Sequence, residues 1–284
     1  MALSDICYAD RARAAGLNVY KVCEADADGN IRTETVTPSN PTFNAYSIAK
    51  AYTVLAFGIC RDRGLIDTGT HITDVLGKYM TEEMKATWSG VTMHHLMKHR
   101  AGYGPGQNLD IDASDAADWP SRDYLKLALD VKLPFAPGEE YHYTDTVFYL
   151  LSRSISEVSG MTAADLLRPA LFDVMDYSEF AWSVCPRGYT MGGTGLYLRT
   201  NDLVKLAVLW LRGGDWFGTR IVSEDWVNMT VEQSYEFSKK SEDGRWIGKG
   251  GMRGQMLTLC PDLSRAVAWN SYQSKVGFSD MIKE

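Results

Sequence analysis

The sequence predicts an α/β (α+β) fold in which one antiparallel sheet, flanked by helices, is built from both chain termini and a helical lobe is inserted between them. Two observations predict it. Short β-rich runs occur near both ends of the chain, and apolar residues recur at helical spacing through the middle. We expect residues 1–65 and 187–284 to form the lobe that contains the sheet, and residues 66–186 to form the helical lobe.

The strands are predicted as two hairpins. Leu17–Val22 and Ile31–Val36 are rich in apolar and β-branched residues and flank a turn segment rich in Asp and Gly. Gln255–Cys260 and Arg265–Asn270 repeat the pattern near the other end, around a turn that begins with Pro261. Because the two hairpins lie at opposite ends of the chain, one sheet would have to join the termini.

The helices follow from apolar spacing and end signals such as Gly64 and Gly160. Asn201 or Asp202 is the expected cap of one of them. The predicted helices are Ser47–Arg63, Thr92–His99, Ser121–Leu129, Thr146–Val158, a helix through Leu203 and Trp210, a short helix after Ser223, and a terminal helix over Lys275–Glu284.

Composition narrows the class of protein. The chain has 284 residues, 45% of them hydrophobic, so it can bury a sizeable core. A net charge of -7 and the lack of a Lys/Arg-rich run argue against nucleic acid as a partner. No apolar stretch reaches the roughly 18 residues that a membrane span needs. The first residues contain no signal-peptide core, so we expect a cytoplasmic protein, or a periplasmic or secreted one if a leader was removed.

The five cysteines include no C-x-x-C pair. This pattern fits a reducing compartment better than a disulfide framework or a zinc finger.

The first candidate for chemistry is Ser47-Ile48-Ala49-Lys50. Residues three apart on a helix lie on one face, so the hydroxyl of Ser47 and the amine of Lys50 would point the same way. A serine needs a base to become a nucleophile, and burial lowers the pKa of a lysine enough for it to serve as one. Ser-x-x-Lys also occurs by chance, so the tetrad needs support from other segments.

Two further segments supply groups of the right kind. Tyr143, in a turn before a predicted helix, has a phenol that can share proton transfer if a cation lies near it. Gly248–Met252 precedes the last hairpin, where glycines allow close approach of a substrate and Lys249 provides positive charge. Taken alone, Tyr143 could equally be a packing aromatic, and the glycine segment an ordinary turn.

Together these motifs resemble the serine β-lactamase and penicillin-binding-protein superfamily, in its class C β-lactamase and family VIII esterase branch. The resemblance extends over nearly the whole chain. It rests on Ser47-x-x-Lys50, Tyr143-x-Asp145, Lys249-x-Gly251, Leu96–Tyr103, Pro137–Leu151, Gly192–Leu196 and Thr200–Leu203, which agree in order and spacing as well as in type. It implies the β-lactamase/transpeptidase-like fold and a serine hydrolase that acts through an acyl-enzyme on an ester, amide or β-lactam.

The resemblance also implies roles for particular residues. Ser47 would be the acylated nucleophile, Lys50 its proton acceptor and Tyr143 the group that protonates the leaving group and activates water. Which of Lys50 and Tyr143 is the acylation base stays open. The oxyanion hole would fall on the backbone N–H groups of Ser47 and Met252. The substrate would be a small molecule or short peptide, bound by Asp145, Lys249, Gly251 and Met252, with no cofactor or metal.

This chain departs from the family pattern at two positions. Asp145 stands where the family usually has Asn, and an ionised carboxylate accepts hydrogen bonds but cannot donate them. We therefore expect poor recognition of the amide carbonyl of typical β-lactam side chains, and a preference for a substrate with an amine. Gly250 stands where the family often has Thr or Ser, so one hydroxyl contact to the substrate is missing.

Two other functions are compatible with the sequence. One is a metal hydrolase, because His95 and His99 have i, i+4 spacing beside His94, although the Glu of His-Glu-x-x-His is replaced by Leu96. A structural role for His99 is the simpler expectation. The other is a non-hydrolytic penicillin-binding or sensor domain with the same fold.

Overall fold

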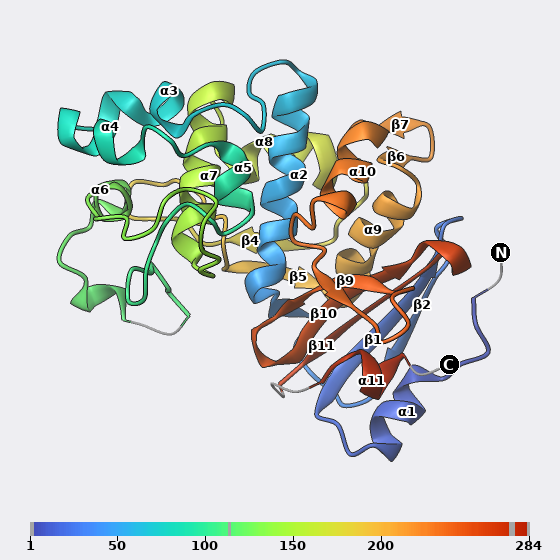
Figure 1. Cartoon of the computed structure of the whole chain (residues 1–284). Coiled ribbons are helices and arrows are strands. Elements are labelled where there is room, and N and C mark those ends of the chain that lie inside the picture. Colours follow the sequence, from blue (N-terminus) through green and yellow to red (C-terminus); the bar gives the residue numbers. More distant parts are fainter. Residues whose placement is uncertain (1–2, 113–114, 273–275, 283–284) are drawn as a thin grey trace. The chain divides into compact units, whose positions relative to one another are not determined.

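The protein is described here from a computed structural model, which covers residues 3–112, 115–272 and 276–282. Its backbone groups into two compact units, coloured along the sequence in Figure 1. The first consists of Met1–Ala51, Leu171–Ala181 and Leu196–Glu284, and the second of Tyr52–Ala170 and Trp182–Gly195.

The first unit is built on a six-stranded antiparallel sheet in the order β2-β1-β11-β10-β9-β8. Its strands are β1 (Val19–Asp26), β2 (Ile31–Thr35), β8 (Lys239–Lys240), β9 (Ile247–Gly251), β10 (Gln255–Cys260) and β11 (Arg265–Ser271). The first and last hairpins of the chain meet where β1 pairs with β11, with Val22 opposite Trp269. The prediction of one antiparallel sheet completed by both ends of the chain is therefore confirmed.

Both faces of this sheet are covered within the first unit. Side chains alternate between the faces of a strand, so Val22, Met256 and Trp269 lie on one face, where they join a buried cluster with residues of α1 (Tyr8–Ala14) and α11 (Phe278–Met281). On the other face α9 (Thr200–Leu211) packs against β1, β10 and β11 (Figure 1). Thr200 Oγ1 donates to Asn270 Oδ1 at 2.9 Å and ties that helix to β11.

Smaller elements complete the first unit. A three-stranded sheet has the order β3-β5-β4, and β6 pairs with β7. The bounds are β3 (Thr42–Asn44), β4 (Phe180–Trp182), β5 (Leu196–Arg199), β6 (Asp215–Trp216), β7 (Thr219–Arg220) and α10 (Glu224–Glu232). The side chain of Ser223 caps α10 by accepting from the N–H of Trp226, as the sequence predicts for a helix after Ser223.

The second unit is mainly helical, apart from the part of β4 that it shares. Its helices are most of α2 (Ala49–Asp62), α3 (Ile72–Leu76), α4 (Glu82–Trp88), α5 (Met93–Met97), α6 (Tyr124–Leu129), α7 (Asp145–Ser159) and α8 (Ala163–Leu167). Helix α7 packs against α3, α5, α6 and α8. Its start is capped by Thr144 and its end by Gly160, whose φ of 73° is readily adopted only without a side chain.

The structure corrects several predicted helix ends. Ser47 lies in a short 3₁₀ turn, η1 (Tyr46–Ile48), and α2 begins only at Ala49. Neither Asn201 nor Asp202 caps α9, because the helix already begins at Thr200 and Asp202 is buried inside it, paired with Lys205.

Three other helices are shorter than predicted. Helix α5 ends at Met97, and α6 begins at Tyr124, because the side chain of Asp123 caps it. The terminal helix covers only Phe278–Met281 of the predicted Lys275–Glu284. Lys275, Lys283 and Glu284 lie outside the described residues.

All five cysteines are free thiols, and four of them are buried. Over the described ranges, no helix combines the length and the apolar character needed to cross a bilayer.

Candidate active site

The hydroxyl of Ser47 and the amine of Lys50 are neighbours. Lys50 Nζ donates to Ser47 Oγ at 3.3 Å, across the step from η1 into α2. Lys50 is 0% exposed, while Ser47 is half-buried. The hydroxyl and the amine are therefore within hydrogen-bond distance, and the amine is shielded from water.

The backbone just before Ser47 is strained. Tyr46 has a φ of 48°, a left-handed conformation that costs a residue with a side chain about 1–2 kcal/mol. The Tyr46 N–H donates to Asn44 Oδ1 at 2.8 Å, which holds the turn. Strained backbone of this kind is often found where a reactive side chain has to be presented in one orientation.

Strand β9 carries Lys249 and Gly251 and packs against the η1 turn. A side chain at Gly251 would run into the carbonyl oxygen of Ala45, two residues before Ser47. Glycine is required there because the two backbones touch. Met252 follows directly, so its backbone N–H belongs to the segment held against the serine turn.

Lys249 is held by a carboxylate that the sequence analysis missed. Lys249 Nζ forms an ion pair with Glu236 Oε2, and the two side chains are only 8% and 3% exposed. Glu236 also has a positive φ of 71°. Twelve residues of sequence lie between the partners, and no motif connects them, so the pair forms only once β9 is folded.

Tyr143 and Asp145 belong to the second unit, at the start of α7. Tyr143 is 41% exposed, and its ring lies against the ring of the buried His99, with centroids 4.5 Å apart. His99 also accepts from the Thr144 N–H through Nδ1 at 3.4 Å, and its carbonyl accepts from the His142 N–H at 2.8 Å. His99 therefore holds the turn that carries Tyr143, which agrees with the structural role expected for it.

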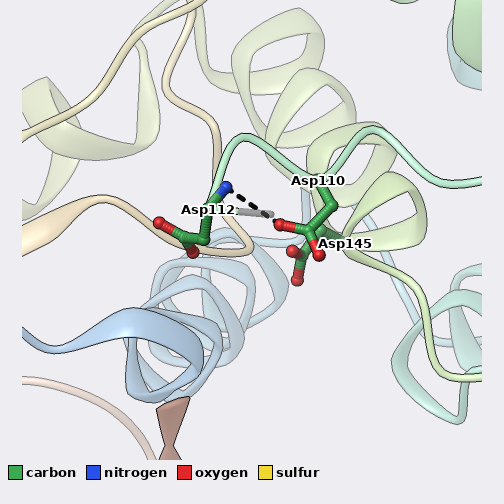
Figure 2. A group of neighbouring side chains, drawn as sticks. All are labelled: Asp110, Asp112 and Asp145. Carbon is green, nitrogen blue, oxygen red and sulfur yellow. Dashed lines mark hydrogen bonds between the residues drawn. The ribbon is translucent and has the colours of Figure 1, made fainter. Parts of the chain in front are cut away.

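Asp145 is one of three clustered aspartates. Ligand oxygens of Asp110, Asp112 and Asp145 all lie within 4.8 Å of one another (Figure 2), and within the described ranges this is the only group of three or more potential metal-ligand side chains. The Asp112 N–H donates to Asp110 Oδ1 at 2.9 Å, and Thr194 donates to Asp112. Carboxylates this close together suit a hard cation or an ammonium group.

The three histidines of the metal-hydrolase reading are not part of that cluster. His95 Nδ1 accepts from the Thr92 N–H at 3.1 Å and caps α5. Burial lowers the pKa of both His94 and His95 below the usual value. His99, in contrast, lies beyond the end of α5 with a φ of 53°, so the i, i+4 helical spacing assumed for His95 and His99 does not exist.

Five of the seven predicted site residues lie in the first unit, and two lie in the second. The first group is Ser47, Lys50, Lys249, Gly251 and Met252, and the second is Tyr143 and Asp145. Sequence reasoning missed Glu236, Asp110 and Asp112, because each becomes a neighbour of a predicted residue only through folding.

Comparison with known proteins identifies the family of this chain. A family model described as Beta-lactamase matches residues 17–280. Penicillin-binding protein 4* of Bacillus subtilis (strain 168) is 25% identical over 142 residues, a stretch that covers 47% of this chain and 29% of the relative. The matched stretch is thus less than a third of that protein's length.

Solved structures agree in fold. A penicillin-binding protein from Bacillus halodurans superposes with a TM-score of 0.73 at 16% identity, over 98% of each chain. A D-stereospecific amidohydrolase from Streptomyces sp. superposes with a TM-score of 0.70 at 14% identity, over 97% of this chain and 96% of the other. At these identities the likeness is one of fold.

Proposed function

This chain belongs to the Beta-lactamase family, and from that premise we propose that it is a serine hydrolase that forms an acyl-enzyme at Ser47. The observation that carries the proposal is the 3.3 Å contact between Ser47 Oγ and the amine of the fully buried Lys50. The family alone would leave open whether the nucleophile and its base are both present in this chain.

In the proposed reaction Ser47 Oγ attacks the carbonyl carbon of an ester, amide or β-lactam while its proton passes to Lys50 or Tyr143. The N–H groups of Ser47 and Met252 are proposed to stabilise the oxyanion, and Lys249 to attract the substrate. The leaving group takes a proton from Tyr143 as its bond to the carbonyl carbon breaks. A water molecule, activated by the same tyrosine, then hydrolyses the Ser47 ester and restores the hydroxyl.

The test is covalent labelling at Ser47. The full chain is incubated with a fluorophosphonate and, separately, with a penicillin probe, and the modified peptide is identified by mass spectrometry, with Ser47→Ala as control. Turnover is measured on 4-nitrophenyl esters, nitrocefin and D-aminoacyl 4-nitroanilides. A chain that neither reacts at Ser47 nor hydrolyses any of these substrates contradicts the proposal.

A second candidate function is a non-hydrolytic penicillin-binding or sensor domain. It is favoured by the likeness to proteins named penicillin-binding proteins. The same labelling experiment separates the two functions. A penicillin adduct at Ser47 that persists for hours supports the binding function, and an adduct that hydrolyses with release of product supports the enzyme.

A further inference from the structure

The edge of the large sheet beside the serine turn carries a cation that the family resemblance does not assign. Lys239 lies on the short edge strand β8, opposite Gly248 of β9. Its side chain extends along β9 to position 250. A Cβ at Gly250 would lie 2.8 Å from Lys239 Nζ and 2.7 Å from its Cε. The absence of a side chain at Gly250 thus leaves the space that Lys239 fills.

The segment of β9 beside Lys239 is the one held against the serine turn. Gly250 is followed by Gly251, whose backbone meets Ala45, and Ser47 lies two residues beyond Ala45. All of these residues are in the first unit. The Lys239 ammonium therefore lies beside the strand that carries Lys249 and leads into Met252.

The charges at this edge leave Lys239 available for an anion. Lys249 already has a carboxylate partner, the buried Glu236. Lys239 is exposed, and no carboxylate of the described ranges lies within ion-pair distance of it. Arg253, one residue past Met252, adds another cation, over the ring of Tyr272.

We propose that Lys239 is a specificity-determining residue that binds a carboxylate of the substrate, in the place where a hydroxyl at position 250 is missing. The proposal rests on the proposed function and narrows its substrate class to esters, amides or lactams that carry a carboxylate. A charged donor forms a stronger hydrogen bond to a carboxylate than a neutral hydroxyl does, so a lysine can compensate for the lost contact.

The test compares a neutral ester, 4-nitrophenyl butyrate, with two esters that carry a carboxylate. Mono-4-nitrophenyl succinate has it on the acyl side, and 3-carboxy-4-nitrophenyl butyrate has it on the leaving group. The measured quantity is the ratio of kcat/KM for each anionic ester to that for the neutral ester. We expect Lys239→Met to lower this ratio about tenfold for at least one anionic ester, and Lys239→Glu to lower it further.

Lys240→Met is the matched control, because Lys240 is the next residue on β8 and its side chain points to the opposite face of the strand. It should keep the ratio within about twofold of wild type. A change of less than threefold in Lys239→Met with both anionic esters overturns the proposal, and so does an equal fall in Lys240→Met. If wild type hydrolyses none of the three esters and takes no label at Ser47, the proposed function itself fails and this assignment fails with it.

Discussion

The Lys50→Met substitution tests whether the amine of Lys50 is the base of the proposed reaction. Met is similar in length to Lys and keeps an apolar side chain in a position that is 0% exposed, but it cannot accept a proton. Removing a general base typically costs a factor of about 10²–10⁴ in rate, or about 2.7–5.5 kcal/mol in the activation barrier. Met also keeps the apolar contacts of the lysine stem, so the site stays filled. We therefore expect Lys50→Met to fold and to lose activity by this factor.

Lys205→Met provides the control, because Lys205 is a lysine with a structural role whose side chain is 12% exposed. Its Nζ donates to the carbonyls of Met175 and Asp176 at 2.9 and 2.7 Å and pairs with the buried Asp202 at 2.8 Å. Losing it leaves Asp202 without its cation, a change that costs about 3–5 kcal/mol when the site is fully buried. This variant should be less stable than wild type and, where folded, should keep its kcat.

The assay is kcat/KM on a 4-nitrophenyl ester together with urea unfolding of both variants. Ser47→Ala sets the level at which activity is absent. If Lys50→Met keeps activity within tenfold of wild type while Ser47→Ala has none, Lys50 is not the base, and the argument from the 3.3 Å contact is wrong.

Three further predictions follow from individual contacts. Gly251→Ala places a methyl group against the Ala45 carbonyl and should cost about 1–3 kcal/mol of unfolding free energy and much of the activity. In Gly250→Ala the nearest atoms to the new methyl group belong to the flexible end of Lys239, so this variant should lose less stability than Gly251→Ala. Equal losses of unfolding free energy in urea would contradict this. Because burial lowers the pKa of His95 below its usual 6.5, the folded state resists protonation and stability falls as the pH drops through that value. His95→Gln keeps an acceptor for the cap of α5 but does not titrate. Its free energy of unfolding should therefore fall less than that of wild type between pH 7.5 and 5.5. An equal fall would show that His95 does not cause the pH dependence. Asp145→Asn should raise the turnover of a penicillin relative to that of an amine-bearing ester, because Asn can donate a hydrogen bond to an amide carbonyl. An unchanged ratio of the two would show that Asp145 does not determine the choice between these substrates.

Local patterns predicted both hairpins and the longer helices, but not the short helices α1, α3, α4 and α8. Alternating and β-branched runs predicted the strands of both hairpins, and Ser223 and Gly160 act as helix ends, as expected. The prediction of Asp202 as a helix cap was wrong, although it is a polar residue near the start of the helix. In the structure it is a buried partner of Lys205, and α9 begins two residues earlier. A propensity at one position does not reveal which distant groups a side chain will meet.

The sequence by itself determined the Ser47 and Lys50 pair, because a spacing of three residues in a helical turn brings two side chains to one side whatever surrounds them. It also determined which segments pair as hairpins, since each hairpin is closed by a short turn. Only the tertiary structure decided the partners of Lys249, Gly250 and Asp145. Those neighbours are Glu236, Lys239 and the Asp110–Asp112 segment, and each comes from a separate loop or strand. Such contacts depend on strand register and loop path, which result from the packing of the whole unit and leave no local periodicity to read.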